Sequence, residues 1–281
     1  MRRIVLAITA ILALALLAST GCATGTMTDE QLEQAVEKVL AANGAIKFSS
    51  FDLTMEATIV NGLEEAQLSG TGIGTVDSVN QRMHLSMEMT VVAPGQDKID
   101  LPVEYYLVDG LMYFSISTPE QGVQWIKMGM PEGMWEQQDQ VQQQLDLLKT
   151  ATEVNYLGTR DVAGVKCYAI EIVPDLASLQ EMVAQAQGQM SGLGDLDLSS
   201  MDLGQMMKEV SVTQYIATDS YLIMQTDEHI VMEITPEAMG LPDEAFDLIM
   251  EDITTTIVFR DYEKPVTIQL PQGALAAIEM S

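Results

Sequence analysis

The sequence predicts an α+β fold built on one large antiparallel sheet of about eleven strands, with two to three helices between its hairpins. Apolar and polar residues alternate with period two over most of the chain between residues 51 and 262, so each strand buries one face and exposes the other. Tight-turn pairs such as Asn61-Gly62 and Asp109-Gly110 separate these runs. In a few segments the period changes to that of a helix, and no linker or internal repeat divides the chain.

The first helix is expected to begin after Thr28. The Thr28 side chain can cap the first turn, and Gln31, three residues later, can bond back to the cap. Its apolar stripe is expected to consist of Leu32, Val36 and Leu40. Asn43-Gly44 should end the helix.

Six strands are expected in the first half of the chain. Alternation and turn signals place them at residues 51–59, 66–76, 83–91, 99–107, 112–116 and 124–128. The second of these strands carries Gly70, Gly72 and Gly74 on one face. Missing side chains at alternate positions favour sharp strand curvature or the close approach of another backbone.

The second half of the chain mixes helices and strands. Helical spacing predicts a helix over residues 134–150, and Pro174 is expected to precede another over residues 176–190. Residues 191–204 are expected to form a loop or flap, and residues 242–251 a short helix or a long connection. Strands are expected at residues 154–159, 165–173, 209–218, 221–225, 229–235 and 253–262.

The first residues have the composition of a signal peptide. Two arginines precede an apolar run, Ile4–Ala18, that is too short to cross about 30 Å of hydrocarbon comfortably. The small residues before Cys22 resemble a bacterial lipobox, although Ser19 stands where that motif usually has leucine. We expect residues 1–21 to be removed, Cys22 to receive a diacylglycerol, and residues 22–27 to form a lipidated tether. Ordinary secretion after cleavage at the small residues is the alternative.

The charge of the chain excludes one class of partner. It carries 41 acidic and 13 basic residues and a formal net charge of -28. Such a surface repels nucleic-acid phosphates and anionic lipid head groups, so no nucleic-acid partner is expected and membrane attachment must come from the lipid anchor. If Cys22 is acylated, Cys167 has no intramolecular partner and is expected to be a small buried hydrophobe.

Three segments carry a resemblance to a known family. They are the aromatic hairpin Val108–Phe114, the hairpin Tyr156–Tyr168, and the last strand with its proline-containing tail, Arg260–Pro271. In this order, behind a lipobox, they resemble the LppX/LprG-type bacterial lipoproteins and their distant relatives, the LolA/LolB lipoprotein carriers.

This resemblance implies both a fold and a type of ligand. It implies a single domain over residues 28–275, folded as a curved antiparallel β half-barrel of about eleven strands enclosing two to three helices. In the family, an apolar cavity between sheet and helices holds acyl chains, and there are no catalytic residues or cofactors to carry over. This chain is more acidic and richer in methionine than the family pattern, which leaves the ligand open.

The sequence shows no catalytic or metal-binding motif. His84 falls on the wet face of its strand and His229 beside a turn, and neither has partners at a defined spacing. The acidic residues Asp195, Asp197 and Asp202 are similar to a calcium loop, but the spacing fails the EF-hand pattern. We therefore expect no enzyme, no metal and no cofactor.

The methionines provide the candidate ligand-binding residues. The chain has 20 of them, and this flexible, polarizable side chain suits a pocket that must fit variable chains, although methionine on a strand face is more often plain core. The candidates are Phe51, Leu53, Met55, Met83, Leu85, Met87, Met89, Leu101, Val103 and Tyr105.

These features predict an exported lipoprotein, anchored to the bacterial cell membrane and facing the periplasm or the exterior, that binds or carries a lipid or other hydrophobic ligand. An anchored scaffold or protein-interaction module with a filled core is the first alternative, with no protein partner identified. An enzyme whose site is assembled by its substrate is the second. A pocket of several hundred Å3 floored by the methionines would favour the carrier, and a close-packed core the scaffold.

Overall fold

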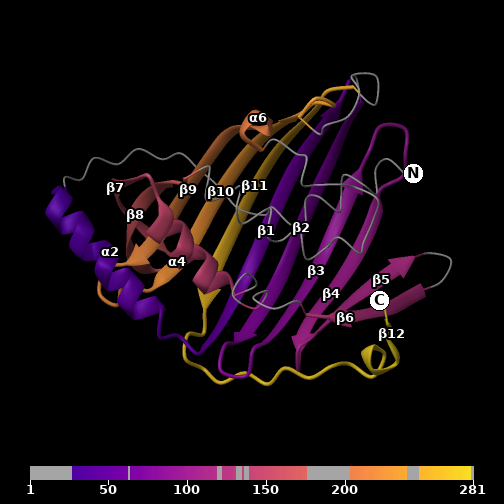
Figure 1. Cartoon of the computed structure of the whole chain (residues 1–281), viewed down its shortest axis with the longest axis horizontal. Helices are drawn as coiled ribbons and strands as arrows, with labels where there is room; N and C mark the ends of the chain where they lie inside the picture. The colour runs from indigo at the N-terminus through magenta and orange to yellow at the C-terminus, as the bar shows by residue number, and fades with distance from the viewer. Residues whose placement is uncertain are drawn as a thin grey trace.

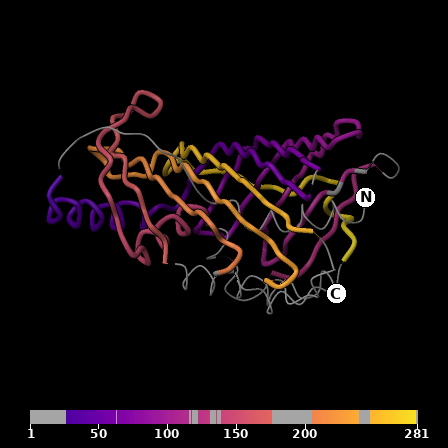
Figure 2. The backbone as a smooth tube through the Cα atoms, turned by 90° about the horizontal axis from the view of Figure 1, so that it is seen from above, coloured from indigo at the N-terminus to yellow at the C-terminus, as the bar shows by residue number. Residues whose placement is uncertain are grey.

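The computed structural model describes residues 27–62, 64–118, 122–130, 135, 139–175, 203–238 and 247–279. These residues form one sheet of twelve strands in the order β12-β6-β5-β4-β3-β2-β1-β11-β10-β9-β8-β7 (Figure 1). The strands are β1 Phe48–Asn61, β2 Glu64–Asp77, β3 Arg82–Val92, β4 Ile99–Val108, β5 Leu111–Thr118, β6 Gly122–Gly129, β7 Glu153–Val162, β8 Val165–Val173, β9 Met207–Ala217, β10 Ile223–Ile234, β11 Ile249–Arg260 and β12 Ile278–Glu279. The sheet is open and curved rather than flat (Figure 2).

The α+β class and the antiparallel sheet are confirmed, and the strand count differs from the expected eleven. The segments 221–225 and 229–235, expected as two strands, are one continuous strand, β10. The short strand β12 is added at the other edge, where it pairs with β6 in parallel. His229 therefore lies within β10 and not beside a turn, because β10 continues through the polar residues that were interpreted as a break.

Two chain-local runs of neighbouring strands meet at the centre of the sheet. β1 to β6 follow one another in one direction and β7 to β11 in the other, so β1 must pair with β11. The antiparallel register runs from Ser50 opposite Arg260 to Asn61 opposite Ile249. This seam places Phe51 beside Phe259 and gives both halves one continuous inner face, with the two rings 6.3 Å apart between centroids.

Helix α2, Asp29–Asn43, begins as the sequence predicts. The Thr28 hydroxyl accepts a hydrogen bond from the backbone of Gln31, whose side chain accepts one from the backbone of Thr28. Its expected apolar stripe, Leu32, Val36 and Leu40, packs against the core but is only partly buried. The buried residues lie on the adjacent line of the helix, Ala35, Val39 and Asn43.

A polar contact at the end of α2 explains why the line through Asn43 is the more deeply buried one. The Asn43 amide donates to the carbonyls of Val39 and Tyr221, both at 2.8 Å, and accepts from the backbone of Ile223 at 3.1 Å. The helix is thereby fixed against the β9–β10 turn through a polar residue, which an apolar stripe cannot indicate.

Helix α4, Gln140–Thr150, lies with α2 at the β7–β10 end of the sheet (Figure 1). It begins after Asp139, whose carboxylate caps the backbone of Val141 and Gln142. Of the earlier part of the predicted helix over residues 134–150, Trp135 is helical, and residues 134 and 136–138 lie outside the described residues. The buried leucines of α4, Leu145, Leu147 and Leu148, join the inner face of the sheet in one hydrophobic cluster. The predicted helix over residues 176–190 lies outside the described residues, and so does most of the predicted loop 191–204, whose last two residues open the short helix α6, Leu203–Met206.

The outer face of β4 to β6 is covered by the C-terminal segment. Tyr106 and Tyr113 cluster there with Ile268 and Ala274, the last in the short 3-10 helix η2, Ala274–Ala276. In Figure 1 this yellow segment runs along the lower edge of the sheet from β11 to β12. The proline-containing tail thus gives the far strands a second, smaller core on the opposite face.

The glycine row of β2 receives neighbouring side chains. A Cβ at Gly74 would lie 2.0 Å from the Phe51 ring, and one at Gly72 would lie 2.7 Å from Cγ of Met87. The nearest group at these positions is a side chain and not the backbone that was expected, because the ring of Phe51 and the side chain of Met87 occupy the space that a Cβ would need.

Gly74→Ala should therefore destabilise the protein by about 1–3 kcal/mol, because the aromatic ring has no free space to move into. Gly129→Ala is the matched control, since nothing lies within 4 Å of its added Cβ and its φ is ordinary. Urea denaturation of both variants measures the difference in free energy of unfolding. Equal stabilities would show that Phe51 does not occupy this space.

Candidate ligand-binding face and tyrosine cleft

The sheet brings all ten predicted ligand-binding residues to its inner face. Cross-strand register places Met55 beside Gly70 and Gly70 beside Met89, and it places Met87 beside Val103. Seven of the ten are buried, and the other three are half-buried at the β3–β4 side: the seven are Phe51, Leu53, Met55, Met83, Met87, Met89 and Tyr105, and the three are Leu85, Leu101 and Val103. Period-two alternation was sufficient to find this face, because every candidate has the same phase as its neighbours.

This apolar half of the inner face is closely packed. All ten residues belong to, or pack against, the same cluster as the buried residues of α2 and α4. Phe51 and Met87 occupy the space above the glycine row. A cleft of about 320 Å3 lies between α2 and the β7–β8 hairpin, and none of the ten candidates lines it.

The other half of the inner face carries a polar network that the sequence analysis did not single out. Gln144 of α4 donates a hydrogen bond from Nε2 to Oε1 of Glu228 at 3.0 Å. Its own Oε1 accepts from Nε2 of Gln214 at 3.0 Å and from the hydroxyl of Thr226 at 3.2 Å. These residues are all fully buried, so the network fixes α4 to β9 and β10 inside the core.

Within the part of the chain that the structure describes, four oxygens on this part of the sheet have no hydrogen-bond partner. They are Oε1 of Gln214, Oε2 of Glu228, Oε2 of Glu251 and Oγ1 of Thr255. Burial raises the pKa of Glu228 well above its ordinary range, and the neighbouring carboxylate of Asp227 raises it further, while the hydrogen bond from Gln144 opposes the shift. Burial also raises the pKa of Glu251 to about 7.

Strand phase was the signal that could have found these acids. Glu228 is in phase with Ile230 and Met232, and Glu251 is in phase with Ile253 and Ile257. A carboxylate on the buried phase of a strand is unusual, because burying an unpaired charge is costly. A pattern of apolar residues alone does not reveal such a buried acid.

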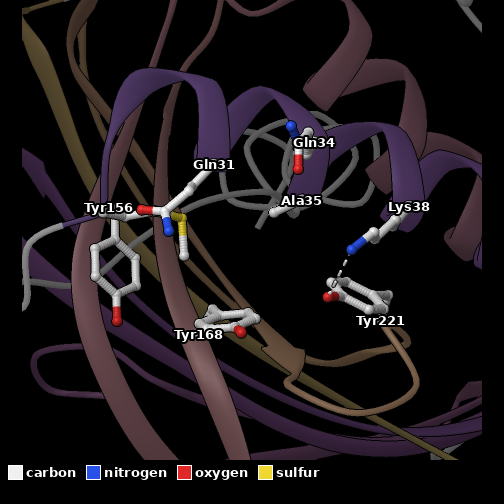
Figure 3. Close-up of a pocket in the computed structure, with 8 residues that line it drawn as sticks. Gln31, Gln34, Ala35, Lys38, Tyr156, Tyr168 and Tyr221 are labelled. Carbon is white, nitrogen blue, oxygen red and sulfur yellow. Dashed lines mark hydrogen bonds between the residues drawn. The ribbon is translucent and has the colours of Figure 1, made fainter.

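A separate cleft lies beneath α2, where Met27 and α2 face the β7–β8 hairpin and the β9–β10 turn (Figure 3). It is lined by Met27, Gln31, Gln34, Ala35, Lys38, Tyr156, Tyr168 and Tyr221. Lys38 donates to the Tyr221 hydroxyl at 3.2 Å, and the Tyr156 and Tyr168 rings meet edge to face at 6.0 Å. We name it the tyrosine cleft; it combines aromatic walls with amide groups and one cation.

The two histidines pair with neighbouring carboxylates, and several other residues singled out in the sequence lie outside the described residues. His84 is on the outer face beside Glu104 at 2.7 Å and stacks on Tyr106, and His229 pairs with Asp252 at 2.7 Å. The described residues include no group of three or more His, Cys, Asp or Glu side chains that could hold a metal ion. Cys22 and the acidic residues Asp195, Asp197 and Asp202 lie outside the described residues.

Cys167 is buried, as predicted. Its side chain is fully inaccessible, and burial raises the pKa of its thiol to about 11. Among the described residues, no helix has both the length and the apolar composition needed to cross a membrane.

The family is shown by a sequence match over most of the chain. Residues 31–278 match the family described as "Family of unknown function (DUF6612)". The chain belongs to DUF6612. No curated protein matches it.

Solved structures similar to this DUF6612 chain include bacterial lipoproteins, as the sequence resemblance predicted. The Mycobacterium tuberculosis lipoprotein LppX is 12% identical over 86% of this chain and 100% of that one, with a TM-score of 0.38. LprF from Mycobacterium bovis is 13% identical over 88% and 99%, with a TM-score of 0.45. A putative outer membrane lipoprotein-sorting protein domain from Vibrio parahaemolyticus is 9% identical over 84% and 94%, with a TM-score of 0.25.

The buried acid Glu251 should make stability depend on pH. Between pH 4.5 and 7 the unfolded chain releases the Glu251 proton while the folded chain retains it, so the free energy of unfolding falls as pH rises through this window. The full loss is about 3 kcal/mol. Glu251→Gln removes the titration, so the variant should gain about this amount relative to the parent between pH 4.5 and pH 8.

Urea denaturation at both pH values measures this gain, with Glu56→Gln as the control on the exposed face of β1. The control should show the same pH dependence as the parent. A constant difference between the parent and Glu251→Gln would mean that Glu251 ionises alike in both states.

Proposed function

We propose that this protein is an exported, lipid-anchored protein of the bacterial cell envelope that binds a hydrophobic ligand on the inner face of its half-barrel. The observation that carries the proposal is the phase of the sheet: β1, β3 and β4 all direct apolar side chains to one concave side, next to a row of glycines. Methionine supplies four of the ten candidate positions, and its flexible side chain can rearrange around chains of different shape.

Binding by this face requires only apolar burial. Each methylene removed from water contributes about 0.8 kcal/mol, so an acyl chain can outweigh the cost of association. The half-buried residues Leu85, Leu101 and Val103 form the most accessible part of the face and are the proposed point of entry. No catalytic step is needed for this role.

The close packing of Phe51 and Met87 favours the alternative, an anchored scaffold with a filled core. The two functions predict different effects of a larger side chain on this face. A face that opens for a ligand loses binding when it is filled, whereas a scaffold has no binding to lose and only overpacks.

Met87→Trp, with Val103→Trp at a half-buried position of the same face, distinguishes these functions. We expect the parent to bind a fluorescent fatty acyl probe and both variants to bind it at least about tenfold more weakly, which corresponds to about 1.4 kcal/mol. Ile73→Trp is the matched control, because Ile73 is 54% exposed on the opposite face of β2.

Fluorescence titration measures affinity, and thermal unfolding confirms that each variant folds. A parent protein that binds no probe, together with a Met87→Trp variant that is merely destabilised, would refute the carrier and support the scaffold. Mass spectrometry of lipids extracted from the purified protein identifies a resident ligand independently.

Anchoring is proposed to depend on Cys22 alone. Cys22→Ala should leave the protein unprocessed or release it from membranes, because a diacylglycerol provides the two acyl chains that stable attachment requires. Membrane fractionation after a high-salt wash measures the bound fraction, with Cys167→Ala as the control at a buried thiol. Retention of most of the Cys22→Ala protein on membranes would refute the lipobox interpretation.

A further inference from the structure

Three buried oxygens on the inner face of β9 to β11 find no hydrogen-bond partner among the described residues. They are Oε1 of Gln214, Oε2 of Glu228 and Oγ1 of Thr255. Gln214 and Glu228 are fully buried, and Thr255 is 1% exposed. A buried polar atom without a partner costs about 1–3 kcal/mol, so three in one region are an expensive arrangement for a core that is only structural.

The three residues lie in one neighbourhood. Glu228 and Thr255 are direct cross-strand partners, with Cβ atoms about 4.5–5.5 Å apart in such pairs. Gln214 is linked to Glu228 through Gln144, which bonds to both. Gln144 satisfies only one carboxyl oxygen of Glu228, and the other is left available beside Thr255.

The chemistry of this group is one-sided. A carboxylate oxygen and an amide oxygen only accept hydrogen bonds, and a hydroxyl can accept one, while the side-chain nitrogens of Gln144 and Gln214 already donate to described oxygens. An ammonium group has three donors and no acceptor, and its charge favours the ionised form of Glu228, so a bound amine displaces the proton that burial otherwise favours there. A carboxylate or phosphate would instead meet acceptors and a like charge.

We propose that Gln214, Glu228 and Thr255 bind the primary amino head group of a hydrophobic ligand. This site rests on the proposed function, because the ligand's chain would lie on the same inner face. The next residues on the same face of these strands are apolar. They are Ile230 of β10, two residues after Glu228, and its cross-strand partner Ile253 of β11. The net charge of -28 adds a general attraction for a cationic amphiphile.

The test compares three ligands of equal chain length in the full chain: dodecylamine, dodecanol and dodecanoate. Each competes with the neutral fluorescent probe N-phenyl-1-naphthylamine. Glu228→Gln keeps the shape and the bond from Gln144 but replaces the free acceptor with a donor. We expect it to weaken dodecylamine about 10- to 100-fold, the range for a lost charge-assisted hydrogen bond, and to leave the other two within about twofold.

Two further variants make the result specific. Thr255→Val removes one acceptor at constant size and should weaken dodecylamine about tenfold, the effect of one hydrogen bond. Glu56→Gln removes an exposed carboxylate from the outer face of β1 and should bind all three ligands like the parent, which measures attraction by surface charge alone. Thermal unfolding confirms that each variant folds.

The outcomes separate this site from the proposed function. If all three ligands bind and Glu228→Gln changes none of them, or weakens them equally, the amino-group site is overturned and the hydrophobic carrier stands. If no ligand displaces the probe and the probe itself does not bind, both are overturned. Selective loss of dodecylamine in Glu228→Gln and Thr255→Val, but not in Glu56→Gln, supports the site.

Discussion

The pairing of β1 with β11 is the contact on which the architecture depends. The two strands are about 200 residues apart in the chain, and each belongs to its own run of neighbouring strands. Their register decides which residues share the inner face, since a slip by one residue would turn every side chain of one half to the other side. With the observed register, Phe51, Leu53 and Met55 stand beside Phe259, Ile257 and Thr255.

The seam joins two halves of different chemistry. On the β1–β4 side the inner face is apolar, and the side chains of Phe51 and Met87 pack into the space that the glycines of β2 leave. On the β9–β11 side the same face carries Thr255 together with Gln214 and Glu228, and the last two bond to Gln144 of α4. An amphiphile has the same division between chain and head group, so a single concave face can meet both parts of one ligand.

Helix α4 is held over the polar half by specific hydrogen bonds, not by apolar contact alone. Gln144 bonds to Glu228, Gln214 and Thr226, and such a network fixes orientation more sharply than a leucine would. Burial raises the pKa of both Glu228 and Glu251, so the interior favours their protonated forms where no cation faces them. The acidic exterior and the acidic interior are thus separate features, the first favouring solubility and the second imposing a chemical preference.

The sequence by itself determined the class of fold, most strand positions, the cap of α2 and the phase of the ten apolar candidates, because period-two alternation and turn residues are local properties of the chain. It also singled out the glycine row of β2, but not that the side chains of Phe51 and Met87 fill the space at Gly74 and Gly72. Only the tertiary structure decided that β10 is continuous, that Asn43 fixes the orientation of α2, and that Gln144 bonds to Glu228 and Gln214 while Thr255 pairs with Glu228 across the strands. Those features depend on cross-strand register and on contacts between residues roughly 70 to 180 positions apart, which no local pattern encodes.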